Sequence, residues 1–420
     1  MATGMPVAFC FLAVNLIWVP FIWPGEAGMM QIILGTSSSL VRFTLLPLPL
    51  FILMGEVIFQ TGIAPFMIEA VDKWLGNLPG RLGLVAVAGG ALFSTLTGAS
   101  VASVAMLGET LVPEMESRGY RKSMSLGPIL GSGGLAIMIP PSGLAVLLGT
   151  VGEISIGRIL IGIIVPGVLM AILYASYIIL RCKLQPSIAP AYEVRRVNMS
   201  EKLISTAKYI LPAGFIIFMV VGVMFAGIAT PTGAAATGAL STFILAAFYK
   251  KLNWVVTKKA LLSTLQVSVM VLMIISASKI FSQILSFSGA ASGLAEFAIG
   301  LPIAPIFIII GMQIILLILG MFMDVASIMM ITLPIFVPIV NNLGFDLVWF
   351  AAIFLLNIEM ATTTPPFGLS LFTMKGVAPS NTTMGDIYRA GLPFLGCDLV
   401  VMVLILVFPP IALMLPGLMR

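Results

Sequence analysis

Two adjacent prolines interrupt each of two long apolar stretches of the sequence. The run Thr-Thr-Thr-Pro-Pro-Phe-Gly at 362–368 lies inside an apolar segment from about 347 to 374. The run Ile-Pro-Pro-Ser-Gly at 139–143 lies inside a segment from about 125 to 150. Proline removes a backbone donor and pushes the preceding residue out of the α region, so each helix must break here. At membrane depth the freed carbonyls are tolerated only where protein or a polar cavity satisfies them.

A constant offset relates the two breaks. Pro365 follows Pro140 by 365 − 140 = 225 residues. Further pairs at this offset are Pro141 with Pro366, Gly143 with Gly368, Pro6 with Pro231, and Pro113 with Pro338. Matching interrupted helices in two halves of a membrane protein are typical of the binding site of a secondary transporter.

The chain around these breaks is too apolar for a soluble domain. Of 420 residues, 60% are hydrophobic and 9% are charged, which predicts an all-α polytopic protein embedded in the lipid bilayer. The small net charge of +5 belongs to connecting loops and does not indicate a nucleic-acid partner. With no histidine and three scattered cysteines, we expect no transition-metal site and no disulfide framework. A membrane-embedded enzyme is disfavoured because no nucleophile has a base nearby in the sequence.

The predicted organisation is two repeats joined by a polar linker. Residues 1–180 form the first repeat, 181–208 a cytoplasmic linker, and 209–420 the second repeat. Each repeat contains a re-entrant hairpin with a polar tip, at 97–100 and 321–324, followed by the interrupted helix. The other predicted segments are an interfacial helix at 29–43 and spans at 5–23, 47–73, 159–180, 209–228, 232–249, 264–287 and 390–415. Because a complete span precedes Pro231 but not Pro6, we expect the first repeat to lack its first helix and the N-terminus to be cytoplasmic.

Loop charges predict that the repeats are inverted. The loop after the first hairpin carries Arg118, Arg121 and Lys122, whereas its counterpart at 341–346 has no Lys or Arg and one Asp. By the positive-inside rule the first loop is cytoplasmic and the second is outside. The two hairpins therefore enter the membrane from opposite faces.

Hydroxyls, glycines and one carboxylate gather at the predicted hairpin tips and breaks. Hard oxygen ligands around unwound helix suit Na⁺, and half-helix N-termini suit an anion. Asp324 is the strongest candidate, since a carboxylate at a re-entrant tip is costly in lipid; its structural alternative is a hydrogen bond to hairpin backbone. The predicted sodium-binding residues are Gly98, Ser100, Ser103, Gly133 and Gly134 at one site and Asp324, Ser327 and Thr363 (or Thr364) at the other. The predicted substrate-binding residues are Ser142, Gly143, Thr364, Pro365 and Gly368.

Each of these residues also has a purely structural interpretation. Ser and Thr hydroxyls in membrane helices often bond to their own helix, and glycines allow close packing. Glu56, Glu109 and Glu359 are interpreted mainly as structural, pairing across helices or capping broken ends. Lys279 is either a buried cation or a side chain that snorkels to the outer interface.

At the level of whole segments, the chain resembles the large membrane (M) subunit of the tripartite ATP-independent periplasmic (TRAP) transporters. The matching stretches are Pro-Leu-Phe-Ile-Leu-Met-Gly-Glu at 49–56, residues 98–103, 139–142, 229–236 and 357–372, and Gly-Asp-Ile-Tyr-Arg at 385–389 with Leu-Pro at 392–393. The family tends to have Glu where Gly233 stands and Asn where Ser370 stands, and Lys279 is also unexpected.

The resemblance implies an elevator fold of the ion-transporter superfamily in the bacterial inner membrane. It implies Na⁺ as coupling ion with no other cofactor, and a carboxylate-type anionic solute delivered by a periplasmic binding (P) protein. It also implies a separate four-helix small (Q) subunit. The alternative is a sodium/dicarboxylate-type symporter of related architecture that needs no binding protein. A channel would not explain two inverted interrupted helices.

Overall fold

The computed structural model describes residues 5, 7–23, 25–76, 78–98, 100–190 and 197–419. Within these ranges the chain is helical and has no strand. Seven of the described helical stretches are long and apolar enough to cross a membrane, or eight if one bent pair counts as a span. The all-α polytopic fold class is therefore confirmed. Pro6, the residues before Met5, and residues 191–196 of the predicted linker lie outside the described part.

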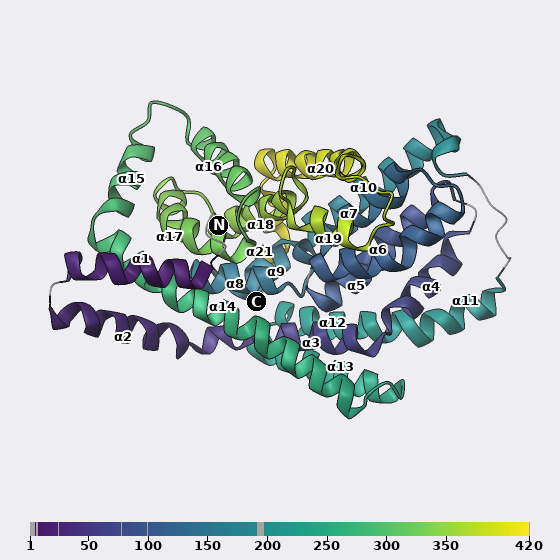
Figure 1. Cartoon of the computed structure of the whole chain (residues 1–420), viewed down its shortest axis with the longest axis horizontal. Helices are drawn as coiled ribbons and strands as arrows, with labels where there is room; N and C mark the ends of the chain where they lie inside the picture. Colours follow the sequence, from purple (N-terminus) through teal and green to yellow (C-terminus); the bar gives the residue numbers. More distant parts are fainter. Residues whose placement is uncertain are drawn as a thin grey trace.

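The helices of the first half follow the predicted order. They are α1 (Val7–Ile22), α2 (Glu26–Leu40), α3 (Pro47–Thr61), α4 (Ala64–Leu75), α5 (Arg81–Thr97), α6 (Ser100–Ser117), α7 (Lys122–Met138), α8 (Gly143–Val151), α9 (Ile156–Gly162) and α10 (Ile164–Leu184) (Figure 1). Short 3₁₀ turns lie at Phe43–Leu45 and Pro186–Ile188.

The second half adds eleven helices among the described residues. They are α11 (Met199–Ser205), α12 (Leu211–Phe225), α13 (Pro231–Phe248), α14 (Trp254–Phe287), α15 (Ala290–Ile299), α16 (Pro305–Gly320), α17 (Val325–Asn342), α18 (Leu347–Thr363), α19 (Leu369–Val377), α20 (Met384–Val407) and α21 (Pro410–Gly417). A π-helical turn at Thr206–Ile210 joins α11 to α12, so the end of the predicted linker is continuous with a span.

The helix bounds repeat with the offset seen in the sequence. Helices α6 and α17 begin at 100 and 325 and end at 117 and 342, and α7 and α18 begin at 122 and 347 and end at 138 and 363. All four differences equal 225. In each half a hairpin, α5–α6 or α16–α17, precedes an interrupted helix, α7–α8 or α18–α19. The first interrupted helix bends by 44°, and both breaks contain a cis Pro-Pro bond.

Sequence-local signals set where several helices begin. Thr230 accepts from the Gly233 N–H and places Pro231 in the first turn of α13, where a missing donor costs nothing. Asp346 accepts from two backbone N–H groups at the start of α18. Thr383 and Asp386 form a capping box at the start of α20. These caps satisfy backbone donors that have no partner inside their own helix.

Two predicted spans were wrong in detail, and one helix was not predicted. The predicted span 47–73 is two helices, because Gly62 ends α3 in the left-handed conformation (φ 62°) and Pro65 lies in the first turn of α4. The predicted span 390–415 also divides, since α20 ends at Val407 and α21 starts after Pro409. Helix α15 was not predicted at all.

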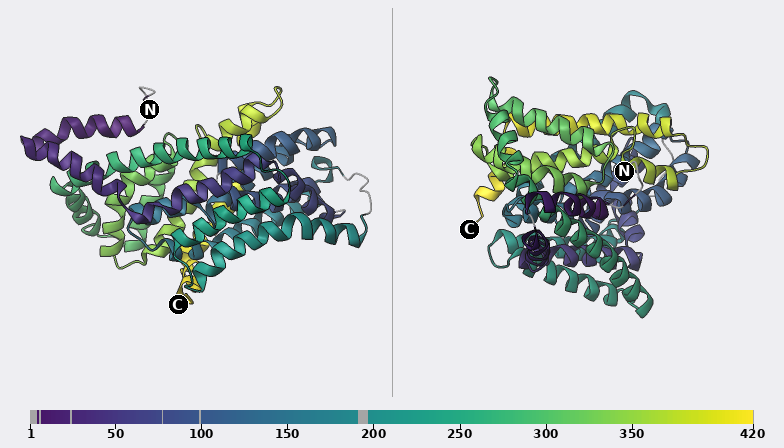
Figure 2. Two further views of the ribbon diagram at one scale, coloured as in Figure 1. Left: turned by 90° about the horizontal axis from the view of Figure 1, so that it is seen from below. Right: turned by 60° about the vertical axis from the view of Figure 1, so that its left-hand side comes forward.

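Interrupted helices form the centre and long helices a layer beside it. Every residue of α7 from Met124 to Met138 and of α18 from Val348 to Thr363 is buried. The 34-residue α14 packs along α1, α2 and α3, while α13 packs on α3 and α12. Figures 1 and 2 show α1, α2 and α15 at one end of the molecule and α4 and α11 at the other.

Candidate functional site

The tip of the first hairpin lies against the first helix break. Gly98 ends α5 in the left-handed conformation (φ 60°), and its N–H donates to the Ser94 carbonyl at 2.7 Å. A Cβ at Gly98 would lie 3.6 Å from both the Gly143 nitrogen and the Pro141 carbonyl oxygen. Gly98 and Gly143, predicted for different ligands, are therefore neighbours.

Ser100, Ser103 and Gly133 meet where α6 packs on α7. Both serines are buried, and the Ser103 hydroxyl lies 3.4 Å from that of Thr97. A Cβ on Gly133 would lie 3.4 Å from the Ser100 carbonyl oxygen and would overlap the Val104 side chain. Three of the predicted sodium ligands thus form one oxygen-rich patch inside the first half.

A chain of hydroxyls connects this patch to the second helix break. The Ser100 hydroxyl lies 3.5 Å from the Ser370 hydroxyl. Ser370 donates to the Thr362 hydroxyl at 3.2 Å, and both side chains are buried. Neither Ser370 nor Thr362 is among the predicted ligands, although Ser370 stands where the TRAP family tends to have Asn.

Ser142 caps the second part of the first interrupted helix. Its hydroxyl oxygen accepts from the Ala145 N–H at 3.4 Å, and the side chain is fully buried. The cap satisfies a donor at the start of α8 and leaves the hydroxyl proton free of this bond. A structural role and a ligand role are therefore compatible at this position.

Asp324 caps α17 at the tip of the second hairpin. One carboxylate oxygen accepts from the Ser327 N–H at 3.1 Å, and the Ser327 hydroxyl donates to the other oxygen. This is the hairpin-backbone bond considered as its structural role. Carboxylate oxygens accept more than one bond each, so the cap leaves Asp324 able to bind a cation.

A cavity of about 560 Å³ separates the second tip from the second break. Asp324 and Thr362 line it together with the rings of Phe322, Phe367 and Phe372. Two of these rings, Phe367 and Phe372, stack 6.4 Å apart. The cavity therefore presents a carboxylate and a hydroxyl within largely apolar walls.

Thr363 and Thr364 do not line this cavity. Both hydroxyls donate to the Met360 carbonyl, at 3.1 Å and 2.6 Å, and both side chains are buried. Thr362 is the threonine that joins Asp324 in the cavity lining. Pro365 is half-buried. A Cβ on Gly368 would overlap the Thr362 carbonyl, so Gly368 is required for the turn itself.

Gly134 makes room for a buried carboxylate. A Cβ there would overlap the side chain of Glu359, which is 1% exposed on α18. The Glu359 Oε2 atom has no hydrogen-bond partner among the described residues. Nearby in the core, Tyr174 of α10 donates to Asp398 of α20. Asp398 is not among the predicted site residues, although an aspartate inside an apolar span is itself a signal of function.

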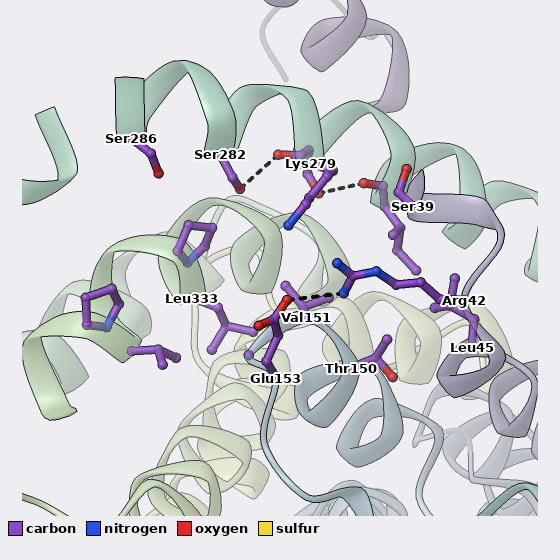
Figure 3. Close-up of a pocket in the computed structure, with 16 residues that line it drawn as sticks. Ser39, Arg42, Leu45, Thr150, Val151, Glu153, Lys279, Ser282, Ser286 and Leu333 are labelled. Carbon is purple, nitrogen blue, oxygen red and sulfur yellow. Dashed lines mark hydrogen bonds and ion pairs between the residues drawn. The ribbon is translucent and has the colours of Figure 1, made fainter. Parts of the chain in front are cut away.

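Lys279 lines a separate cavity with Arg42 and Glu153 (Figure 3). Arg42 Nη1 lies 3.3 Å from Glu153 Oε1, and Lys279 is half-buried. Lys279 is therefore a half-buried cation that faces a polar cavity, and the choice between a buried and a snorkelling side chain stays untested.

Comparison with known proteins identifies the family. The model of the tripartite ATP-independent periplasmic transporter, DctM component, matches residues 1–411. The chain is 31% identical to the C4-dicarboxylate TRAP transporter large permease protein DctM of Pseudomonas aeruginosa, covering 90% of this chain and 87% of that one. It is 28% identical to the ectoine/5-hydroxyectoine TRAP transporter large permease protein UehC of Ruegeria pomeroyi, covering 93% and 89%.

A solved structure shows the same fold. The YdaH transporter of Alcanivorax borkumensis aligns with a TM-score of 0.67 at 14% identity, covering 96% of this chain and 98% of that one. At this low identity the likeness concerns the fold alone. With the family model over nearly the whole chain and relatives named as permeases, this protein is a multi-pass membrane permease subunit and not an enzyme. It belongs to the DctM component family of the tripartite ATP-independent periplasmic transporters.

Proposed function

We propose that this chain is the membrane-embedded subunit of a Na⁺-coupled importer for an anionic organic solute. A periplasmic binding protein delivers the solute, and a separate small four-helix subunit completes the complex in the bacterial inner membrane. Relatives named for C4-dicarboxylates, isethionate and sialic acid support a carboxylate-type or related anion. The contact between Ser100 and Ser370 supports a single site shared by both halves.

Two oxygen-rich places suit the coupling ions. One is the patch of Ser100, Ser103 and the unwound backbone at Gly98. The other is the cavity with Asp324 and Thr362, with Ser327 beside it. A solute anion alone at membrane depth is strongly destabilised, and Asp324 adds negative charge. Bound Na⁺ offsets the negative charges of the solute and of Asp324, so the loaded site crosses the membrane more easily than a half-loaded one.

Movement of the site is proposed to follow an elevator mechanism. The two hairpins and the interrupted helices would slide as one body against a scaffold of α1–α3 and α12–α14. Support comes from Gly55 of α3, where a Cβ would overlap the backbone of Thr97 at the first hairpin tip. Because Gly55 has no side chain, the backbone of α3 packs directly on the hairpin tip. No side chain of Gly55 would then obstruct sliding between the moving and static parts.

Reconstituted uptake tests the proposal. The chain, with its small subunit, is placed in proteoliposomes and supplied with its binding protein and labelled solute. Uptake is expected only with the binding protein present and an inward Na⁺ gradient, and not with an equal K⁺ gradient. Na⁺-driven uptake of free solute without the binding protein would instead support the symporter alternative.

A further inference from the structure

A basic cavity lies apart from the hairpin tips, where four parts of the chain meet. It has a volume of about 280 Å³ and is bordered by the end of α2 with the residues after it, the end of α8, the later part of α14, and α17. Figure 3 shows Arg42, Lys279 and Glu153 directed toward the same space. These are the charged residues among the lining side chains, so the lining carries a net charge of 2 − 1 = +1.

The single acidic residue holds Arg42 only weakly. Glu153 reaches one guanidinium nitrogen at 3.3 Å, and the two side chains are 35% and 67% exposed. Solvent-exposed pairs of this kind contribute little, and a guanidinium has five N–H donors. Glu153 itself has φ 55°, in the left-handed region that disfavours a side chain. The loop therefore holds a weakly bound carboxylate in front of Arg42, in a place that another carboxylate can take.

The charge of Lys279 is not balanced by an ion pair within 4.0 Å with any residue that the structure describes. It also lines an adjoining cavity of about 350 Å³ with Gln283 and Ser286. A charged side chain inside a membrane helix is costly and is by default a functional hypothesis. The Lys279 ammonium group thus lies between two polar cavities, and its N–H donors are not used in an ion pair with a described residue.

We infer that this cavity is a binding site for the carboxylate of a small organic anion, distinct from the site at the hairpin tips. Arg42 and Lys279 supply the charge, and a bound carboxylate would displace Glu153 from Arg42 and neutralise the lining. The alternative anion in a membrane is a lipid phosphate. Polar side chains from three of these elements, Ser39 of α2, Thr150 of α8 and Ser282 of α14, favour a compact hydrated anion. That this anion is the transported solute, held here before it reaches the hairpin tips, rests on the proposed function.

A local thiol probe tests the site without any transport. In a background without the three native cysteines, Ser286→Cys places a thiol in the cavity lining, and Ser288→Cys places one on an exposed residue outside it. The chain with its small subunit is embedded in phosphatidylcholine nanodiscs. Each thiol is then modified by two methanethiosulfonate reagents. One carries an anionic sulfonate group, and the other carries a cationic trimethylammonium group. The ratio of the two rates cancels differences in thiol reactivity.

The expected ratio of anionic to cationic rate is roughly tenfold higher at position 286 than at 288, because positive clefts concentrate anions. Succinate at constant ionic strength should slow the anionic reagent at 286 only. Lys279→Gln should remove the preference, Lys279→Arg should retain it, and Glu153→Gln should increase it. A higher ratio of anionic to cationic rate in Glu153→Gln cannot come from misfolding. The test therefore remains decisive even if Lys279→Gln fails to fold.

Equal ratios at the two positions, or no slowing by succinate, would overturn the inference. A second arm adds phosphatidylglycerol to the nanodiscs. If this lipid slows the reagent at 286 and succinate does not, the occupant is a lipid headgroup and the proposed site is wrong. These outcomes are independent of uptake, so a failure of Na⁺ coupling does not affect them.

Discussion

The hydroxyl oxygens of Ser100 and Ser370 lie 3.5 Å apart although 270 positions of sequence separate them. Ser100 begins α6 in the hairpin of the first half, and Ser370 lies in α19, just after the break of the second half. Through Ser370 the hydroxyl chain reaches Thr362, which also lines the cavity of Asp324. The two predicted ion sites are thus connected through the interface between the halves, and a change at one has a physical route to the other.

The first prediction concerns the charge of Asp324. Asp324→Asn removes the charge but keeps the helix cap, since Asn caps as well as Asp. We expect a folded protein whose Na⁺-dependent uptake is strongly reduced, because losing about 1.4 kcal/mol of cation binding weakens affinity tenfold. The measurement is solute uptake in proteoliposomes at increasing Na⁺.

Asp346→Asn is the matched control. Asp346 caps α18 as Asp324 caps α17, but it lies away from the hairpin tip. This variant should retain uptake with an unchanged Na⁺ dependence. If Asp324→Asn behaves like the control, the Asp324 carboxylate is structural and the second ion site is wrongly assigned.

The second prediction concerns the contact between Gly134 and Glu359. A methyl group on Gly134 would overlap the buried Glu359 side chain, and overpacking of this kind costs about 1–3 kcal/mol. Gly134→Ala should therefore lower the midpoint of thermal unfolding of the purified complex. Gly311→Ala is the control, because a Cβ at Gly311 of α16 meets nothing within 4 Å and alanine favours the helix. A Gly134→Ala variant as stable as the control would contradict the packing described.

The periodic features of the fold could be predicted from the sequence. The proline pairs mark both breaks, and their offset of 225 recurs in the bounds of α6, α7, α17 and α18. Proline lacks a backbone donor and interrupts the helix at its own position, so the break can be located from the sequence. The division between α3 and α4 was missed because the left-handed Gly62 resembles a helical residue when only hydropathy is considered.

The site was less predictable than the fold, because its geometry depends on packing between distant helices. Thr362, Thr363 and Thr364 are adjacent and chemically alike, yet only Thr362 lines the Asp324 cavity. Which of the three threonines faces the cavity depends on where α18 unwinds. The prediction that Gly134 is a sodium ligand stays untested. The structure adds that the absence of a side chain at Gly134 leaves space for the side chain of Glu359. The contact of Ser100 with Ser370 depends on how the halves pack and has no signal in either segment alone.

The third prediction concerns relative movement. Cysteines placed along α6 from Ser103, each paired with one at Leu53 of α3, should crosslink at different registers in inward- and outward-biased conditions. The control is a pair at Thr97 and Ser103, whose hydroxyls lie 3.4 Å apart within one hairpin and which should crosslink equally in both conditions. A single unchanging set of crosslinks between α3 and α6 would rule out the elevator.

The last prediction concerns the buried bond between Tyr174 and Asp398. Both side chains are almost fully buried, at 0% and 3% exposure, and the Tyr174 hydroxyl donates to the carboxylate. Tyr174→Phe leaves the buried acceptor without this donor, which costs about 1–3 kcal/mol, so the unfolding midpoint of the purified complex should fall. Asp398→Asn keeps an acceptor for the tyrosine and should cost less. Adding Asp398→Leu to Tyr174→Phe removes the unpaired group and should recover part of the loss, since an apolar pair leaves nothing unsatisfied. If Tyr174→Phe is neutral, or if the double variant is less stable than Tyr174→Phe alone, the bond does not hold α10 to α20.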